Sequence, residues 1–230
     1  MSAIVLLSGG LDSAVNLKQA VLESGVAAAL TFDYGQRAAA REAAASAHMC
    51  QELDVPHLLI ELPWLAEACP GALVDRTAPL PKVTPEQLTE EAVTSGETAK
   101  SVWVPNRNGL FVNIAAVFAV ARGADLIVAG FNSEEAATFP DNSADFVAAA
   151  NTALALSAGA ALRLHSYTQD LTKTDIVRLG RQIDAPLSYI WSCYSGGSDH
   201  CRCCESCARL ERALREAGAW EWFNVQHILP

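Results

Sequence analysis

The chain alternates short apolar runs with longer segments in which apolar residues recur every three or four positions. The apolar runs predict strands at residues 3–7, 26–32, 57–62, 125–131 and 161–166. The segments between them predict helices over about residues 13–23, 38–53, 108–122, 143–157 and 172–183, with Asn108, Ser143 and Thr172 as helix caps. Strands separated by helices are typical of right-handed βαβ units around a parallel sheet. We therefore expect an α/β fold with a doubly wound, Rossmann-type sheet.

Regular patterning lapses between residues 63 and 104, where prolines and scattered polar residues follow no steady period. An irregular segment of this length is typical of a functional lid or an interface. We expect residues 1–186 to form the α/β domain, with 63–104 as its lid or interface segment. Residues 187–230 are expected to form a small C-terminal segment packed on that domain.

The composition narrows the class of protein. Hydrophobic residues make up 51% of the 230 residues, enough for one domain with a sizeable core. The apolar stretches are too short to cross a bilayer and no leader precedes the first predicted strand, so we expect no membrane association and a cytoplasmic location. A net charge of −10 and the lack of a basic cluster favour a small-molecule substrate over nucleic acid. A homodimer is the expected oligomer, because dimers are the commonest state of soluble enzymes.

One motif, Ser8-Gly9-Gly10-Leu11-Asp12-Ser13, stands between the first predicted strand and the first predicted helix. The N–H groups at a helix N-terminus attract anions, and two glycines allow a tight turn that a phosphate can approach. The motif lacks the lysine and the glycine spacing of a Walker P-loop. The alternative is a glycine-rich turn in which Ser13 only caps the helix.

Seven cysteines are present, and five of them lie between Cys193 and Cys207. In a chain without an export signal, such a cluster predicts a metal site rather than disulfides. Cys193, Cys201, Cys204 and Cys207 suit a closed tetrahedral zinc site with a structural role, and Cys203 is then a spare thiol. An iron–sulfur cluster, a redox dithiol and buried free cysteines are the alternatives.

Several segments occur in the same order as in the 7-cyano-7-deazaguanine synthase family, and the chain resembles that family over most of its length. The matching segments are residues 8–13, 33–37, 104–108, 171–180 and 191–194, with Cys201, Cys204, Cys207 and Arg209. The first of them looks like the pyrophosphate loop (PP-loop) of the ATP pyrophosphatases. The resemblance implies an adenine-nucleotide alpha-hydrolase-like fold.

The resemblance also implies an ATP-dependent carbon–nitrogen ligase. It would convert 7-carboxy-7-deazaguanine and ammonia to 7-cyano-7-deazaguanine, a precursor of queuosine and archaeosine, through an adenylated acid and an adenylated amide. The expected ATP-binding residues are Leu7, Ser8, Gly9, Gly10, Leu11, Asp12, Ser13 and Ala14. Asp12 would hold magnesium on the leaving pyrophosphate.

Charge accumulates on the phosphates during such a reaction, so cationic side chains aimed at them are valuable. Lys173 and Arg107 are the expected catalytic cations, and Asp12 is the expected catalytic carboxylate. Arg37 is a further candidate for contact with the substrate. The alternative for each cation is a surface salt bridge.

The chain departs from the family pattern at a few places. Asn106 and Arg202 stand where the family usually has glycine, and residues 133–141 differ from the usual sequence. This last segment follows a predicted strand end, where we expect it to line the substrate pocket. Glu134, Glu135 and Asp141 are the candidates for accepting hydrogen bonds from a guanine-like N–H edge.

Two other functions remain open from the residues alone. One is a PP-loop enzyme that amidates or thiolates a different acceptor, either a small carboxylate or a tRNA base. The other is a nucleotide-binding module, held together by zinc, without catalysis. Release of AMP and pyrophosphate separates the enzymes from the module.

Overall fold

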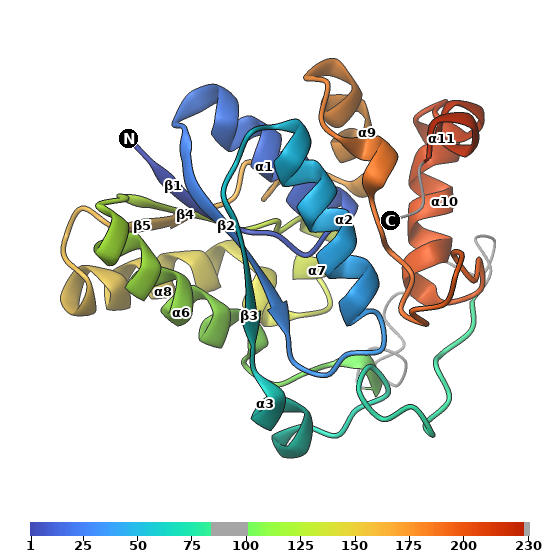
Figure 1. Cartoon of the computed structure of the whole chain (residues 1–230), viewed down its shortest axis with the longest axis horizontal. Coiled ribbons are helices and arrows are strands. Elements are labelled where there is room, and N and C mark those ends of the chain that lie inside the picture. Colours follow the sequence, from blue (N-terminus) through green and yellow to red (C-terminus); the bar gives the residue numbers. More distant parts are fainter. Residues whose placement is uncertain (84–100, 228–230) are drawn as a thin grey trace.

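Five parallel strands form one sheet in the order β3-β2-β1-β4-β5 in the computed structural model, which describes residues 1–83 and 101–227 (Figure 1). The strands are β1 (Ala3–Leu6), β2 (Val26–Asp33), β3 (His57–Glu61), β4 (Leu126–Val128) and β5 (Arg163–His165). The chain runs outward from β1 to β3 on one side and from β4 to β5 on the other. The carboxyl ends of β1 and β4 therefore flank the point where strand order reverses, which is where open α/β sheets bind ligands. The predicted doubly wound sheet is confirmed.

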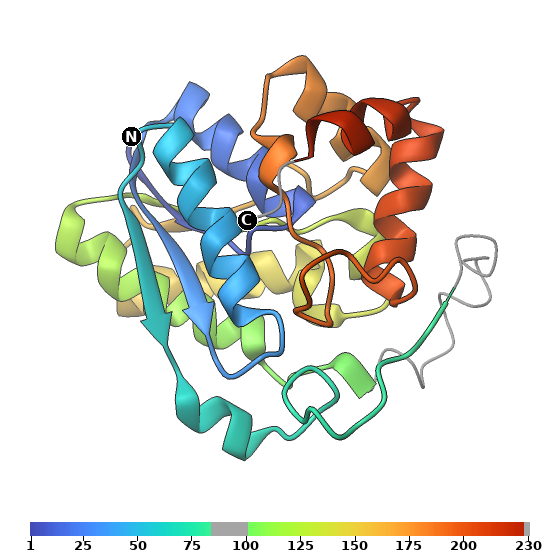
Figure 2. The ribbon, with the colours of Figure 1, turned by 45° about the vertical axis from the view of Figure 1, so that its right-hand side comes forward.

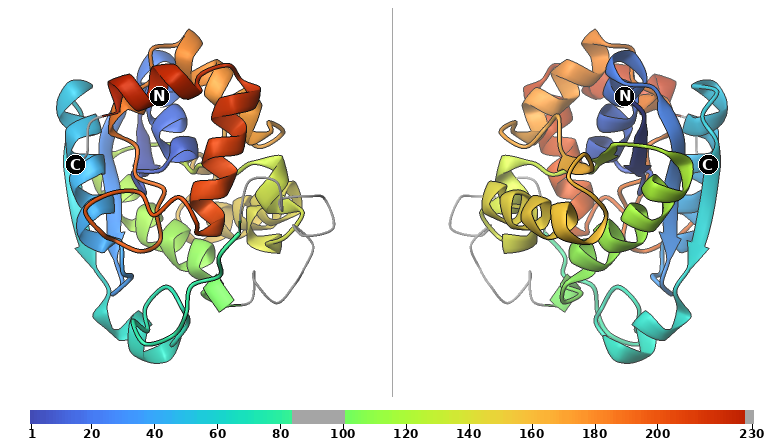
Figure 3. Two further views of the ribbon diagram at one scale, coloured as in Figure 1. Left: turned by 90° about the vertical axis from the view of Figure 1, so that its right-hand side faces the viewer. Right: turned by 90° about the vertical axis from the view of Figure 1, so that its left-hand side faces the viewer.

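Helices cover both faces of this sheet. The helices are α1 (Leu11–Glu23), α2 (Ala39–Glu52), α3 (Pro63–Ala68), α6 (Arg107–Arg122), α7 (Ser133–Ala136), α8 (Ala144–Ser157), α9 (Lys173–Gln182), α10 (Glu205–Glu216) and α11 (Trp220–Gln226), with single 3₁₀ turns at Pro140–Asn142 and Leu187–Tyr189. Side chains of α1, α2, α9 and α10 pack in one core cluster, and side chains of α6 and α8 pack in the other. Figures 2 and 3 show α9 and α10, in orange and red, side by side. Within the described residues, no helix has both the length and the apolar character needed to span a bilayer.

The two core clusters meet the sheet on opposite faces because strand side chains alternate. Val5 belongs to the cluster with α1 and α9, and its neighbour Ile4 belongs to the cluster with α6. Both are fully buried, as expected for a central strand covered on each face.

The cysteine-containing segment joins this core rather than forming a core of its own. Cys193, Cys204 and Cys207 lie in the same cluster as Val15 and Ile176. The described part of the segment after residue 186 is thus packed against the α/β body. The boundary at residue 186 stays a prediction.

The first residues of the helices can be compared with the caps that the sequence predicts. Ser143 and Thr172 cap α8 and α9 as predicted, with side-chain oxygens that accept from the N–H groups of Phe146 and Asp175. The prediction of Asn108 as a cap is wrong, because α6 begins at Arg107. Asn108 instead donates from its side chain to the backbone oxygen of Asp141 at 3.1 Å.

The segment predicted as irregular, residues 63–104, begins with a helix. Pro63 stands at the start of α3, where its missing N–H has no intrahelical partner to lose. Further along, Lys82 forms an antiparallel bridge with Cys204, which places this part of the segment against the cysteine loop. Residues 84–100 lie outside the described residues.

Two non-glycine residues adopt a left-handed backbone where the related family usually has glycine. Asn106 has a φ of 54° and Arg202 a φ of 55°. Asparagine tolerates this region better than most residues, whereas in arginine, as in alanine, contact of the Cβ with the backbone costs energy. At Asn106 and Arg202 the chain therefore keeps a backbone conformation that favours glycine although the residue is not glycine.

Glycine should be more favourable at position 202 than a small residue with a Cβ, because the backbone there is left-handed. We expect Arg202→Gly to exceed Arg202→Ala in free energy of unfolding by about 1 kcal/mol, because both variants lose the same side chain and only glycine relieves the strain. Urea unfolding of the metal-loaded protein measures the difference. Equal stability of the two variants would show that this backbone position carries no strain.

Candidate active site

The loop between β1 and α1 folds into a small network of hydroxyls and backbone N–H groups. Ser13 Oγ accepts from the Ser8 N–H at 3.2 Å and donates to the Gly10 oxygen at 3.1 Å. The hydroxyls of Ser8 and Ser13 lie 3.2 Å apart. Gly10 is the N-cap of α1, so the free N–H groups of the helix start face this loop. The arrangement suits an anion, as the motif predicts.

Glycine is required at two positions by close backbone approach. A Cβ on Gly9, whose φ is 76°, would lie 2.8 Å from the backbone oxygen of Glu42. A Cβ on Gly130, just after β4, would lie 2.8 Å from the backbone nitrogen of Ser13. The absence of these side chains lets the ends of β1 and β4 and the start of α2 converge on the loop.

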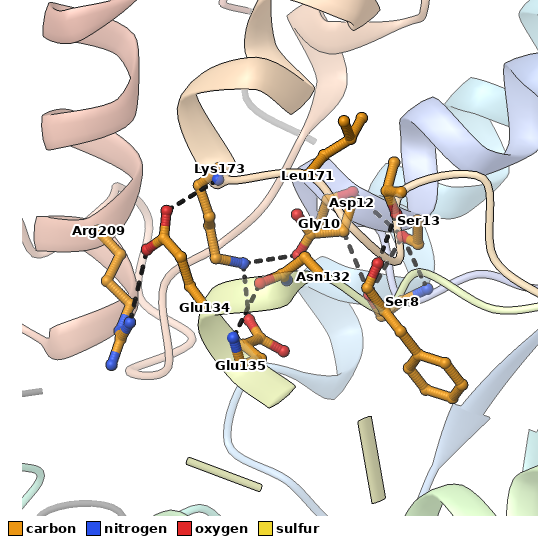
Figure 4. A network of polar contacts seen from close by, with 12 residues as sticks. Ser8, Gly10, Asp12, Ser13, Asn132, Glu134, Glu135, Leu171, Lys173 and Arg209 are labelled. Carbon is orange, nitrogen blue, oxygen red and sulfur yellow. Dashed lines mark hydrogen bonds and ion pairs between the residues drawn. The ribbon is translucent and has the colours of Figure 1, made fainter. Parts of the chain in front are cut away.

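Lys173 lies between two carboxylates at the edge of the loop. Its Nζ is 2.6 Å from Asp12 Oδ2 and 2.6 Å from Glu135 Oε1 (Figure 4). Burial opposes the charge on this ammonium, but the two carboxylates outweigh burial and raise the pKa of Lys173. Lys173 therefore stays charged at neutral pH.

The two carboxylates respond differently to the same lysine. Burial raises the pKa of Asp12 despite its contact with Lys173. The pKa of Glu135 is lowered, because Lys173 outweighs the effect of burial there. Within the described residues the second oxygen of Asp12, Oδ1, is buried without a hydrogen-bond partner. Such an oxygen suits a hard divalent cation.

A cavity of about 270 Å³ opens above this cluster. It is lined by the predicted nucleotide residues Leu7, Ser8, Gly10, Leu11, Asp12 and Ser13, and by the predicted site residues Arg107, Glu135, Asp141 and Lys173. The sheet thus brings together residues from four well-separated parts of the chain.

Four other predicted residues are not among the described residues that line this cavity. Gly9 accepts at its backbone oxygen from the Trp191 N–H at 2.8 Å, and Ala14 is fully buried in the first turns of α1. Arg37 donates to the backbone oxygens of Asp75 and Ala78. Glu134 faces α9 and α10 instead of the cavity, and its contacts are described below.

The opposite wall of the cavity is aromatic. Phe32 and Phe111 stack with ring centroids 4.0 Å apart, and Arg107 donates to the Tyr34 hydroxyl at 3.2 Å. Glu42 lines the same region and accepts from Gln36 at 2.8 Å, and burial raises its pKa. Flat apolar rings beside a few polar groups suit a heterocyclic base.

Residues of α10 complete the cavity, and the sequence patterns did not identify them as lining residues. Arg209 donates from Nε and Nη2 to Glu205 Oε1, at 3.0 and 2.6 Å, and both residues line the cavity. Their spacing of four residues places them on one face of a helix. That spacing was the available signal, but it becomes visible only once α10 is known to be helical.

The cysteine cluster has the geometry of a metal site. The sulfur atoms of Cys193, Cys201, Cys204 and Cys207 all lie within 4.8 Å of one another. A zinc ion with four thiolates at about 2.3 Å needs sulfur atoms about 3.8 Å apart, so the four cysteines fit. Backbone N–H groups of Cys201 and Cys204 donate to sulfurs of the cluster, each at 3.3 Å, as is favourable for thiolates. Cys203 lies outside the cluster.

Known proteins with similar sequences belong to the family that the motifs of this site indicate. The family model described as "Queuosine biosynthesis protein QueC" matches residues 2–218. The 7-cyano-7-deazaguanine synthase of Pelotomaculum thermopropionicum is 52% identical over 218 residues, covering 95% of this chain and 98% of the relative. That of Desulforamulus reducens is 51% identical, covering 95% of each chain. That of Bdellovibrio bacteriovorus is 45% identical, covering 98% of this chain and 96% of the relative. A match of this extent, on a chain whose PP-loop and cysteine cluster are both intact, means that the chain belongs to the QueC family of queuosine biosynthesis proteins.

Proposed function

We propose that the protein is an ATP-dependent ligase that converts 7-carboxy-7-deazaguanine and ammonia to 7-cyano-7-deazaguanine. The main support is identity of up to 52% over nearly the whole chain to proteins that carry the name of this activity. The convergence of Ser8, Asp12, Ser13 and Lys173 at one cavity adds the chemistry of a pyrophosphate leaving group. A small-molecule acceptor agrees with the acidic chain, whose net charge is −10.

The reaction needs two activations. In the first, a carboxylate oxygen of the acid attacks the α-phosphorus of ATP, and pyrophosphate leaves toward the Ser8–Ser13 loop. Ammonia then attacks the acyl carbon, and AMP leaves with that oxygen while the nitrogen loses a proton. In the second, the amide oxygen attacks another ATP, pyrophosphate leaves, and loss of two N–H protons and AMP forms the nitrile.

Lys173 and Arg107 are proposed to stabilise the developing charge. The ammonium of Lys173 lies 2.6 Å from Asp12, so it sits where phosphate oxygens would approach the loop. A fixed cation in a buried site stabilises a transition state without reorganising water. Glu135 holds the lysine from the other side, and Asp141 and Arg37 remain candidates at the acceptor.

Two metals belong to the proposal. Asp12, with its buried unpartnered oxygen, would hold magnesium, which neutralises charge on the phosphates when bound. The four cysteines would hold zinc, which leaves no open position and therefore supplies structure rather than chemistry. We also propose a homodimer in the cytoplasm, with residues 187–230 as the zinc-binding segment.

The proposed function is tested best by following the two carboxylate oxygens of the acid into AMP. We expect turnover of the acid with ATP, magnesium and ammonium to yield the nitrile and two AMP per product, counted by mass spectrometry. Acid labelled with ¹⁸O in both carboxylate oxygens should place one labelled oxygen in each AMP. AMP release without nitrile would instead indicate a different acceptor, and absence of any AMP would refute the ligase proposal.

Loss of the Lys173 charge should slow the reaction. We expect Lys173→Met to lower kcat by about 10²- to 10³-fold, because the phosphates lose a buried cation. Lys18→Met, on the partly buried side of α1, is the matched control and should keep wild-type turnover. Urea unfolding of each variant shows that the loss is measured on folded protein. A folded Lys173→Met enzyme with normal kcat would exclude this role.

Removing a cluster ligand should release the metal. We expect about one zinc per chain in the purified protein, and loss of that zinc with a lower melting temperature in Cys201→Ser. Cys203→Ser removes a thiol from the same loop but outside the cluster and should keep the metal. Metal analysis measures the zinc content of each variant, and thermal unfolding measures its melting temperature. Iron with visible absorption in the wild type would favour the iron–sulfur alternative.

A further inference from the structure

Glu134 and Glu135 are neighbours in α7, yet they contact different parts of Lys173 (Figure 4). Glu135 Oε1 binds the side chain, 2.6 Å from Nζ. Glu134 Oε1 accepts from the backbone N–H of Lys173 at 2.9 Å. One carboxylate thus fixes the ammonium, and the other fixes the main chain that carries it.

The backbone contact matters because Lys173 is the first residue of α9. N–H groups in the first turn of a helix have no partner inside the helix. Thr172 accepts from Asp175 N, and Glu134 supplies the acceptor for Lys173 N from a separate segment. A carboxylate at this position also interacts favourably with the helix dipole. Glu134 therefore acts as a cap on α9 from outside the helix.

The other oxygen of Glu134 is held by α10. Arg212 donates to Glu134 Oε2, and Arg209 Nη1 lies 3.8 Å from the same oxygen. The side chains of Glu134 and Arg209 are only 18% and 8% exposed, so their charges are largely removed from water. Buried charges of this kind depend strongly on their partners. Both carboxylate oxygens of Glu134 are thus held, one by α9 and the other by α10.

Helix α10 in turn begins at the cysteine cluster. Cys204 is its N-cap and Cys207 lies in its first turn, five residues before Arg212. A continuous chain of contacts therefore runs from the cysteine cluster through α10 and Glu134 to the backbone of Lys173.

We propose that Glu134 is a positioning residue, which sets the place of Lys173 relative to the PP-loop and couples that place to the metal-bearing helix. This inference rests on the proposed ligase function. It replaces the expectation that Glu134 reads the base of the substrate, because Glu134 is not among the described residues that line the cavity.

The test compares two substitutions of Glu134, one that removes the hydrogen-bond acceptor and one that keeps it. Glu134→Ala removes both contacts, and Glu134→Gln keeps a neutral acceptor for the Lys173 N–H. We expect Glu134→Ala to lower kcat about 10- to 100-fold through misplacement of the lysine, with KM for the acid within about twofold of wild type. Glu134→Gln should recover part of the lost kcat. Glu134→Ala combined with Arg212→Met should be no slower than Glu134→Ala alone.

The matched control is an ion pair on α10 whose contacts in the described structure include neither Glu134 nor Lys173. Arg215 and Glu211 lie 2.7 Å apart, and Glu211→Gln and Arg215→Met should leave kcat and KM unchanged. Metal content is measured for every variant, so that loss of the cluster is not mistaken for loss of positioning. If Glu134→Ala does not fold, Arg212→Met alone tests the link and should lower kcat with an unchanged KM.

Hydrogen exchange gives a readout that does not depend on turnover. The amide of Lys173 should exchange about fivefold faster in Glu134→Ala, as for loss of a helix cap, while amides in the middle of α9 keep their protection. A raised KM for the acid with normal kcat would overturn the proposal and return Glu134 to base recognition. Unchanged kcat and exchange would also overturn it. An inactive wild type would refute the ligase function alone, since the exchange result stands separately.

Discussion

The buried ammonium of Lys173 is the contact on which the rest of the site depends. It joins the loop after β1, the turn after β4 and the start of α9 through Asp12 and Glu135, residues 161 and 38 positions away in the chain. A buried ion cluster of this kind adds little stability compared with apolar packing, because each charge has lost its water. Stability alone therefore gives little reason for these three buried charges, whereas the proposed contact of Lys173 with a phosphate does.

The parallel sheet makes this meeting possible. Reversal of strand order between β1 and β4 opens a crevice at their carboxyl ends, and glycine at positions 9 and 130 lets the backbone segments approach within it. The cysteine-bearing segment closes one side by supplying Glu205 and Arg209 to the wall. The edge of the sheet thus provides the phosphate loop, and helix α10 provides part of the wall that encloses it.

Much of this arrangement could be predicted from the residues. The strands, the caps Ser143 and Thr172, the loop Ser8–Ser13 and the cluster of four cysteines all depend on local patterns, and the structure contains them. Helix α10 was not predicted, although its buried residues Cys207, Leu210 and Leu214 recur at helical spacing. The spacing of the cysteines as metal ligands overlaps its first turn and obscures this period. The lining residues Glu42 and Phe111 lie inside ordinary helical patterns, and only tertiary packing reveals that they face the cavity. Glu134 likewise has contacts that no local pattern encodes.

The order of the segments along the chain has a consequence for biosynthesis of the protein. The phosphate loop, residues 8–13, precedes the cysteine cluster and the wall residue Arg209 by at least 180 positions in the chain. During synthesis, the residues of the loop therefore leave the ribosome long before the residues of the wall that encloses them. The enclosed cavity can form only after helix α10 has been synthesised, and a chain that stopped before this helix would lack that part of the wall.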